Sequence, residues 1–184
     1  MKNNYRGEKN NGKKNHEIIT LIVIMTMLNL VFYWKFITGQ EYFLVSSDMG
    51  IQQYSAVIEW LKNIGGGVKG WSFLNGMGNN YDYSGFMISP NIFLLLFGVK
   101  NLKYTFIWYH LIKMYLASIA FFFALTKIGI KEKAAVYGAL CYVYSATFIV
   151  RSFWESYALE FVLFAFLLYA MECYFQDKNW IILV

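Results

Sequence analysis

The chain has 184 residues, of which 58% are hydrophobic, 21% aromatic and only 15% charged. Soluble domains contain about 25% charged residues, so this composition excludes an ordinary soluble protein. The net charge of +5 does not indicate nucleic-acid binding, because five of the 16 basic residues gather in a short tail before an apolar segment. These tail residues are Lys2, Arg6, Lys9, Lys13 and Lys14. The sequence therefore predicts a membrane protein without a nucleic-acid partner.

The first apolar segment, residues 18–37, predicts a transmembrane helix. About 20 residues of α-helix cross a hydrocarbon core of about 30 Å. The apolar centre of a signal peptide is shorter, about 7–15 residues, and a small-residue cleavage site follows it, which this sequence lacks. The basic tail, residues 1–17, predicts a cytoplasmic N-terminus by the positive-inside rule. Residues from 38 onward are therefore expected outside the membrane.

Residues 38–103 predict a long outer loop that is too aromatic to be disordered and is expected to be functional. Apolar residues at spacings of three and four predict an amphipathic helix over residues 48–64, lying on the membrane surface. The apolar segment 86–98 is too short to cross and is expected to be re-entrant or interfacial. Between them, Trp71 to Tyr81 mixes glycines, aromatic residues and amides. This mixture suits either a sugar-binding loop or a tightly turned surface loop.

Three further crossings are expected at residues 104–126, 134–150 and 157–175, and residues 180–184 begin a fifth apolar segment. The fold class is therefore an all-α, multi-pass transmembrane bundle with a large first extracytoplasmic loop. Because the last apolar segment stops after five residues, we expect the chain to be the N-terminal part of a longer protein.

Two ionisable residues, His110 and Lys113, fall inside the second expected crossing. They are three residues apart and so share one face of a helix. A charge at the centre of a bilayer costs about 2.5–3.5 kcal/mol, so such residues are candidates for a functional site. One interpretation is a cationic site for a phosphate or carboxylate, and the other is that Lys113 snorkels to the outer headgroups. No metal-binding motif is present, and Cys141 and Cys173 are expected to be packing residues.

The order of these features resembles the N-terminal portion of the YfhO family of bacterial membrane proteins, over about residues 15–184. The residues that carry the resemblance are Ser47-Asp48-Met49-Gly50-Ile51-Gln52-Gln53-Tyr54, the loop from Trp71 to Asn80, Ser89-Pro90 and Lys113. That family is regarded as similar to the GT-C class of multi-pass glycosyltransferases, and it is regarded as having a role in decorating envelope polymers such as lipoteichoic acid.

The resemblance implies transfer of a sugar from a polyprenyl phosphate to an envelope polymer. It implies that Asp48 is the catalytic base or the group that orients the acceptor, and that Lys113, with His110, contacts the phosphate. It further implies a set of sugar-loop residues, namely Trp71, Asn79, Asn80 and Tyr81. The GT-C class often pairs its acidic residues, whereas Met49 and Gly50 follow Asp48 here, so a divalent metal is unsupported and no cofactor is expected.

Two other hypotheses stay open from the residues alone. In a transporter or flippase component, His110, Lys113 and Glu160 would form an intramembrane polar path. The other is an inactive, truncated membrane protein. Separately, Asp48 could serve only as a first-turn acid of its helix, a stabilisation of about 0.3–1 kcal/mol.

Overall fold

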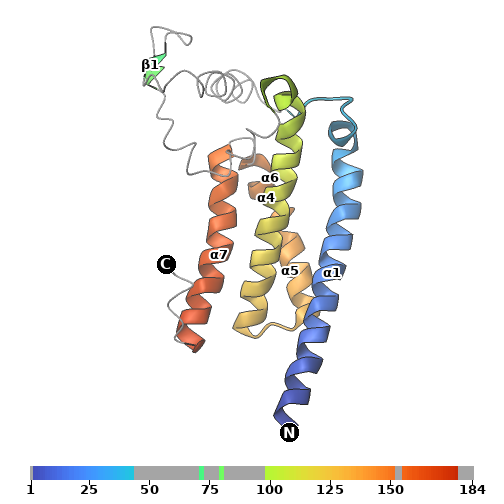
Figure 1. Ribbon diagram of the computed structural model, residues 1–184, viewed down its shortest axis with the longest axis vertical. Coiled ribbons are helices and arrows are strands. Elements are labelled where there is room, and N and C mark those ends of the chain that lie inside the picture. Colours follow the sequence, from blue (N-terminus) through green and yellow to red (C-terminus); the bar gives the residue numbers. More distant parts are fainter. Residues whose placement is uncertain (1, 44–70, 73–78, 81–97, 152–154, 178–184) are drawn as a thin grey trace. The chain divides into compact units, whose positions relative to one another are not determined.

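The computed structural model describes residues 2–43, 71–72, 79–80, 98–151 and 155–177. Its elements are α1 (Lys2–Ile37), β1 (Trp71–Ser72), β2 (Asn79–Asn80), α4 (Gly98–Ile128), α5 (Glu132–Val143), α6 (Ala146–Arg151) and α7 (Glu155–Asp177) (Figure 1). Two compact units result: the first unit comprises Met1–Trp34 and His110–Val184, and the second unit comprises Lys35–Tyr109. The expected elements at residues 48–64 and 180–184 lie outside the described residues, as does all but the last residue of the expected segment 86–98.

Three of the helices contain segments that are long and apolar enough to cross a membrane. These segments are Lys14–Ile37 in α1, Lys103–Ile128 in α4 and Leu159–Gln176 in α7. They cover the first, second and fourth segments that the apolar pattern indicates. Within the described residues, the other regular structure consists of the shorter helices α5 and α6 and one antiparallel pair of two-residue strands. The expected all-α, multi-pass membrane fold is therefore confirmed.

Helix α1 begins at Lys2, well before the apolar segment, and its 36 residues span about 54 Å. The polar tail therefore continues the helix instead of forming a separate irregular segment. Nothing in residues 2–17 interrupts it, because this stretch has no proline and each of its two glycines costs a helix only about 1 kcal/mol.

One face of α1 packs inside the first unit. Its buried residues are Leu21, Met25, Asn29 and Tyr33, spaced four residues apart, while most of the residues between them are exposed. A four-residue spacing keeps side chains on neighbouring turns of one helix face. We call these four residues the buried stripe of α1.

Helix α4 lies beside α1 and runs in the opposite direction (Figure 1). Two hydrogen bonds join them, 2.9 Å between the Thr26 and Tyr115 hydroxyls and 3.1 Å between the Tyr33 hydroxyl and His110 Nε2. The residue numbers rise on α1 as they fall on α4, which establishes the antiparallel arrangement. We call these two hydrogen bonds the α1–α4 seam.

The third apolar segment, expected as one helix over residues 134–150, is divided into α5 and α6 at Tyr144 and Ser145. Helix α5 has 12 residues and is about 18 Å long, too short to cross the hydrocarbon core alone. The Ser145 hydroxyl donates a hydrogen bond to the Tyr142 carbonyl oxygen (2.8 Å) and accepts one from the Phe148 backbone N–H (3.2 Å). Ser145 thus acts as the N-cap of α6, and this local hydrogen bonding competes with a continuous helix.

Helix α4 ends in a glycine turn. Gly129 has a φ of +103°, its N–H donates to the Thr126 carbonyl (3.2 Å), and the Ile130 N–H donates to the Leu125 carbonyl (3.0 Å). These two hydrogen bonds form a Schellman motif, which satisfies carbonyl groups at the end of a helix.

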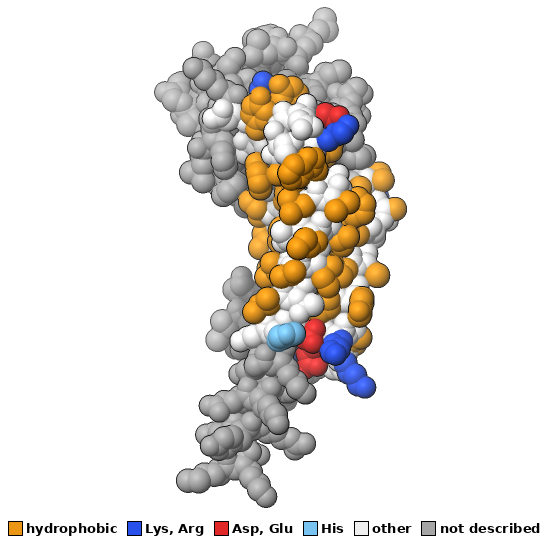
Figure 2. Space-filling view, turned by 90° about the vertical axis from the view of Figure 1, so that its right-hand side faces the viewer, with side chains coloured by type: hydrophobic (Ala, Val, Ile, Leu, Met, Phe, Trp, Pro, Cys, Tyr) orange, Lys and Arg blue, Asp and Glu red, His pale blue; other side chains and the backbone are white. Residues whose placement is uncertain are grey.

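Apolar side chains cover much of the outward surface of the described helices (Figure 2). This is the surface that hydrocarbon requires of a spanning bundle, since lipid offers no partners for polar groups. Of the two cysteines, Cys173 is buried and Cys141 is exposed. The expectation that both are packing residues is therefore wrong for Cys141, which lies on an outward face of α5.

Candidate functional site

The two ionisable residues of the second crossing lie inside the first unit. His110 and Lys113 are each only 2% exposed. A lysine that snorkelled to the headgroups would expose its ammonium group beyond the protein, so this burial argues against snorkelling. The ring of Tyr33 also meets the His110 ring edge-on, with 5.3 Å between the ring centres. Helix α1 thus holds His110 in place from the side.

Asn29, on the buried stripe of α1, is a further polar residue of this region that the apolar pattern does not reveal. It is 2% exposed, and its Oδ1 accepts a hydrogen bond of 2.7 Å from the Tyr144 hydroxyl. Its Nδ2 has no hydrogen-bond partner among the residues that the structure describes. A buried amide of this kind is a donor available to another group, since leaving it unmatched costs about 1–3 kcal/mol.

Asn29 and Lys113 lie at the same level of the first unit. Each falls between the two hydrogen bonds of the α1–α4 seam, Asn29 on α1 and Lys113 on α4. At this level the bundle therefore has both an ammonium group and an amide N–H. Groups of this chemistry suit a negatively charged partner.

Glu160 does not share this environment. It is exposed on α7, whereas His110 and Lys113 are buried. A polar path through the membrane requires its ionisable residues to face the interior of the bundle or an aqueous cavity. The exposure of Glu160 therefore weakens the transporter hypothesis.

The glycine-rich loop is described at two short strands. β1 pairs with β2 in antiparallel register, with Trp71 opposite Asn80 and Ser72 opposite Asn79. The structure thus brings the backbones of three sugar-loop candidates together in one strand pair. The other candidates of the outer loop, Asp48 and Tyr81, lie outside the described residues.

Within the second unit, an aromatic and cationic cluster joins the segment after α1 to the beginning of α4. Lys103 Nζ donates a hydrogen bond of 3.0 Å to the Tyr42 hydroxyl and lies 4.7 Å and 5.0 Å from the ring centres of Tyr42 and Tyr104. The hydrogen bond from Lys103 lowers the pKa of the Tyr42 hydroxyl, and the Tyr104 hydroxyl and the charge of Lys103 act in the same direction. Such clusters are typical of the membrane–water interface.

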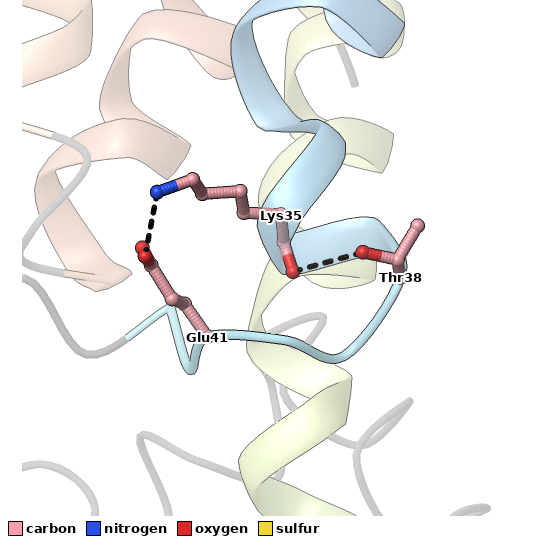
Figure 3. A network of polar contacts seen from close by, with 3 residues as sticks. All are labelled: Lys35, Thr38 and Glu41. Carbon is pink, nitrogen blue, oxygen red and sulfur yellow. Dashed lines mark hydrogen bonds and ion pairs between the residues drawn. The ribbon is translucent and has the colours of Figure 1, made fainter.

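The turn that follows α1 is also part of the second unit (Figure 3). Lys35 Nζ forms an ion pair of 3.0 Å with Glu41, and the Thr38 hydroxyl donates to the Lys35 carbonyl oxygen at 3.3 Å. Gly39, with a φ of +74°, packs against the Tyr104 ring, 3.4 Å from where a Cβ would stand. The exposed ion pair adds little stability, about 0–1 kcal/mol. The positive φ of Gly39, which glycine adopts readily at the end of a helix, is the feature that turns the chain here.

No group of three or more histidine, cysteine, aspartate or glutamate residues that could hold a metal ion occurs among the described residues. Among the described residues, the candidate site of the first unit contains the nitrogen groups of Asn29, His110 and Lys113 and the hydroxyls of Tyr33 and Tyr144.

The comparisons with known proteins identify one family. The family model of the bacterial membrane protein YfhO matches residues 19–184, which is most of the chain. Neither the curated proteins nor the solved structures include a significant match. Residues 19–184 include every described helix beyond the polar tail and the buried residues Asn29, His110 and Lys113 of the candidate site. The chain therefore belongs to the YfhO family of bacterial membrane proteins.

Proposed function

We propose that this protein is a glycosyltransferase-like membrane protein that transfers a sugar from a polyprenyl phosphate to an envelope polymer of the lipoteichoic-acid type, on the outer face of the membrane. Membership of the YfhO family supports a bacterial membrane protein, and the resemblance of that family to the GT-C class suggests sugar transfer. The structural observation that carries the proposal is the burial of Lys113 beside His110 in an apolar bundle. A cation in this environment is costly and is retained where it has a task.

The proposed mechanism needs a base and a cationic contact. The carboxylate of Asp48 accepts the proton of the acceptor hydroxyl while the hydroxyl oxygen bonds to the anomeric carbon. The bond between that carbon and the phosphate oxygen breaks, and its electron pair leaves with the phosphate. Lys113 stabilises the negative charge that develops on the phosphate, and His110 lies beside it. The proposed sugar contacts are Trp71, Asn79, Asn80 and Tyr81.

Substitution of Lys113 tests the phosphate contact. Loss of one electrostatic contact to a developing charge typically costs about 10²–10³ in rate. We therefore expect Lys113→Ala to lower the amount of polymer-bound sugar at least tenfold. Lys113→Arg keeps the positive charge, so it should lower that amount less than Lys113→Ala does. Polymer-bound sugar would be measured in cells alongside the membrane abundance of the complete protein. Lys100→Ala is the matched control, because Lys100 belongs to the same helix but precedes its apolar segment, Lys103–Ile128. Equal losses from both Lys113 variants, with low abundance, would show a packing role instead.

Substitution of Asp48 tests the base. Asp48→Asn keeps the size of the side chain and its ability to cap a helix, but an amide cannot accept the proton. We expect the polymer-bound sugar to fall about 10²-fold or more, with normal abundance of the protein. Asp82→Asn, at another acidic residue of the same outer loop, provides the control. Normal glycosylation with Asp48→Asn would exclude Asp48 as the base.

A further inference from the structure

A cavity of about 390 Å³ lies at one end of the first unit, away from the residues that the proposed function uses. His16 and Glu17 line it from α1, and Lys131, Glu132 and Lys133 line it from the beginning of α5. Figure 2 shows charged and histidine side chains gathered at the lower end of the described helices, directly below the apolar surface. The volume is within the usual range of ligand sites, about 300–1,000 Å³.

The position of the cavity along the helices places it at a membrane–water boundary. His16 and Glu17 stand near the beginning of the apolar segment Lys14–Ile37 of α1, and α5 begins shortly after the end of the apolar segment of α4. About one turn farther into the apolar zone, Ile19 is 61% exposed and Tyr137 is 69% exposed. A molecule in the cavity would therefore have water on one side and apolar, lipid-facing side chains on the other.

The charges that line the cavity are balanced. Two lysines and two glutamates line it, together with one histidine. Among the described residues, none of these five side chains forms an ion pair or a side-chain hydrogen bond. Lys131, at the N-cap position of α5, makes no capping hydrogen bond with its side chain, so the first backbone N–H groups of that helix also add positive potential.

A ligand that matches this lining carries both signs of charge. A purely anionic headgroup would meet the two glutamates, and a purely cationic group would meet the two lysines. We propose that the cavity binds the zwitterionic headgroup of a phospholipid that carries a phosphate and a primary amine, as in phosphatidylethanolamine. Lys131 and Lys133 contact the phosphate, Glu17 and Glu132 contact the ammonium group, and the acyl chains lie along the exposed apolar residues next to the cavity. This site is independent of the proposed sugar transfer.

Lipid binding to the purified complete protein tests this inference by native mass spectrometry. The protein would be equilibrated with phosphatidylcholine vesicles that contain a minor fraction of either phosphatidylethanolamine or phosphatidylglycerol. We expect phosphatidylethanolamine to be retained preferentially, and each lysine contact to change its binding about fivefold. Equal retention of phosphatidylcholine would overturn the proposal, because its quaternary ammonium group donates no hydrogen bond.

The variants separate the two halves of the headgroup site. We expect Lys131→Gln with Lys133→Gln to lower the binding of phosphatidylethanolamine and of phosphatidylglycerol, because both headgroups contain the phosphate. We expect Glu17→Gln with Glu132→Gln to abolish the preference for phosphatidylethanolamine over phosphatidylglycerol. Glu160→Gln, on an exposed face of α7, is the control and should change neither.

Two results would contradict the assignment even if binding is seen. A preference of the unaltered protein for phosphatidylglycerol would show that the site selects anionic lipids and that Glu17 and Glu132 do not determine its selectivity. Displacement of the lipid by soluble glycerophosphoethanolamine at a similar concentration would show a site for a free headgroup compound instead of a membrane lipid. Unchanged thermal unfolding of each variant would establish that altered binding does not reflect misfolding.

Discussion

At the scale of single residues, the hydroxyl of Tyr144 connects the break between α5 and α6 to α1. It donates to Asn29 Oδ1 at 2.7 Å and lies 3.3 Å from the Met25 carbonyl oxygen. Tyr144 therefore holds the amide of Asn29 with its oxygen toward the break. The nitrogen of that amide then remains available at the level of Lys113.

Removal of this hydroxyl should have a measurable but modest effect. We expect Tyr144→Phe to lower the free energy of unfolding by about 0.6 kcal/mol, and by no more than about 1.7 kcal/mol, as for other side-chain hydrogen bonds in membrane proteins. Titration of the protein with a denaturing detergent in bicelles would measure it. Tyr137→Phe is the matched control, since Tyr137 is 69% exposed on α5. An equal effect of both variants would mean that the hydrogen bonds of Tyr144 contribute nothing specific.

At the scale of elements, glycine turns determine where α1 and α4 end. Gly39 follows α1 and Gly129 follows α4, and both have positive φ values. In each turn the glycine N–H donates to the carbonyl oxygen three residues before it, Gly39 to Phe36 and Gly129 to Thr126, both at 3.2 Å. The apolar segments alone would not set these ends, because apolar residues such as Ile130 continue past Gly129.

Substitution of Gly129 should therefore report on backbone strain alone. Nothing lies within 4 Å of the position that a Cβ would occupy, so a side chain meets no neighbour there. We expect Gly129→Ala to destabilise the protein by about 1–2 kcal/mol because of the positive φ. Gly129→Asn should cost less, because asparagine tolerates this region of φ better. The midpoint of thermal unfolding in detergent would compare them, and equal midpoints for Gly129→Ala and the unaltered protein would contradict this reading of the turn.

At the scale of the whole molecule, the distribution of basic residues predicts the orientation in the membrane. The polar tail and the beginning of α5, which carries Lys131 and Lys133, should both be cytoplasmic by the positive-inside rule, and the outer loop should face the opposite side. We expect tags at the N-terminus and near Lys131 to be protected in intact cells, and a tag near Gly66 to be accessible. Labelling of introduced cysteines with a membrane-impermeant reagent would measure this. Strong external labelling near Lys131 would show that segment 86–98 crosses the membrane after all.

The sequence predicts the spanning helices of this fold better than its interior contacts. In lipid, the backbone polar groups of a long apolar segment find hydrogen-bond partners by forming a helix, so residues 18–37, 104–126 and 157–175 were identifiable from composition. The break at Tyr144 was not identifiable, because an apolar segment has the same hydropathy whether its helix is continuous or broken. Lys113 was identifiable because a charge is rare in such a segment. Asn29 was not, since a single amide gives no spacing pattern and its importance depends on what α4 and Tyr144 place beside it.

The spacing of the buried stripe on α1 has a consequence for assembly. An α-helix turns by 100° per residue, so each four-residue step advances about 40° around the axis, and the stripe winds slowly around α1. Accordingly, Tyr33 at one end contacts α4, whereas Met25 and Asn29 contact Tyr144 between α5 and α6. The buried stripe of α1 therefore contacts two different partners, α4 and the break between α5 and α6. A segment expressed from residue 98 onward would lack the contacts of α1 with His110 and with Tyr144. Supplying α1 as a separate chain should restore both sets of contacts together.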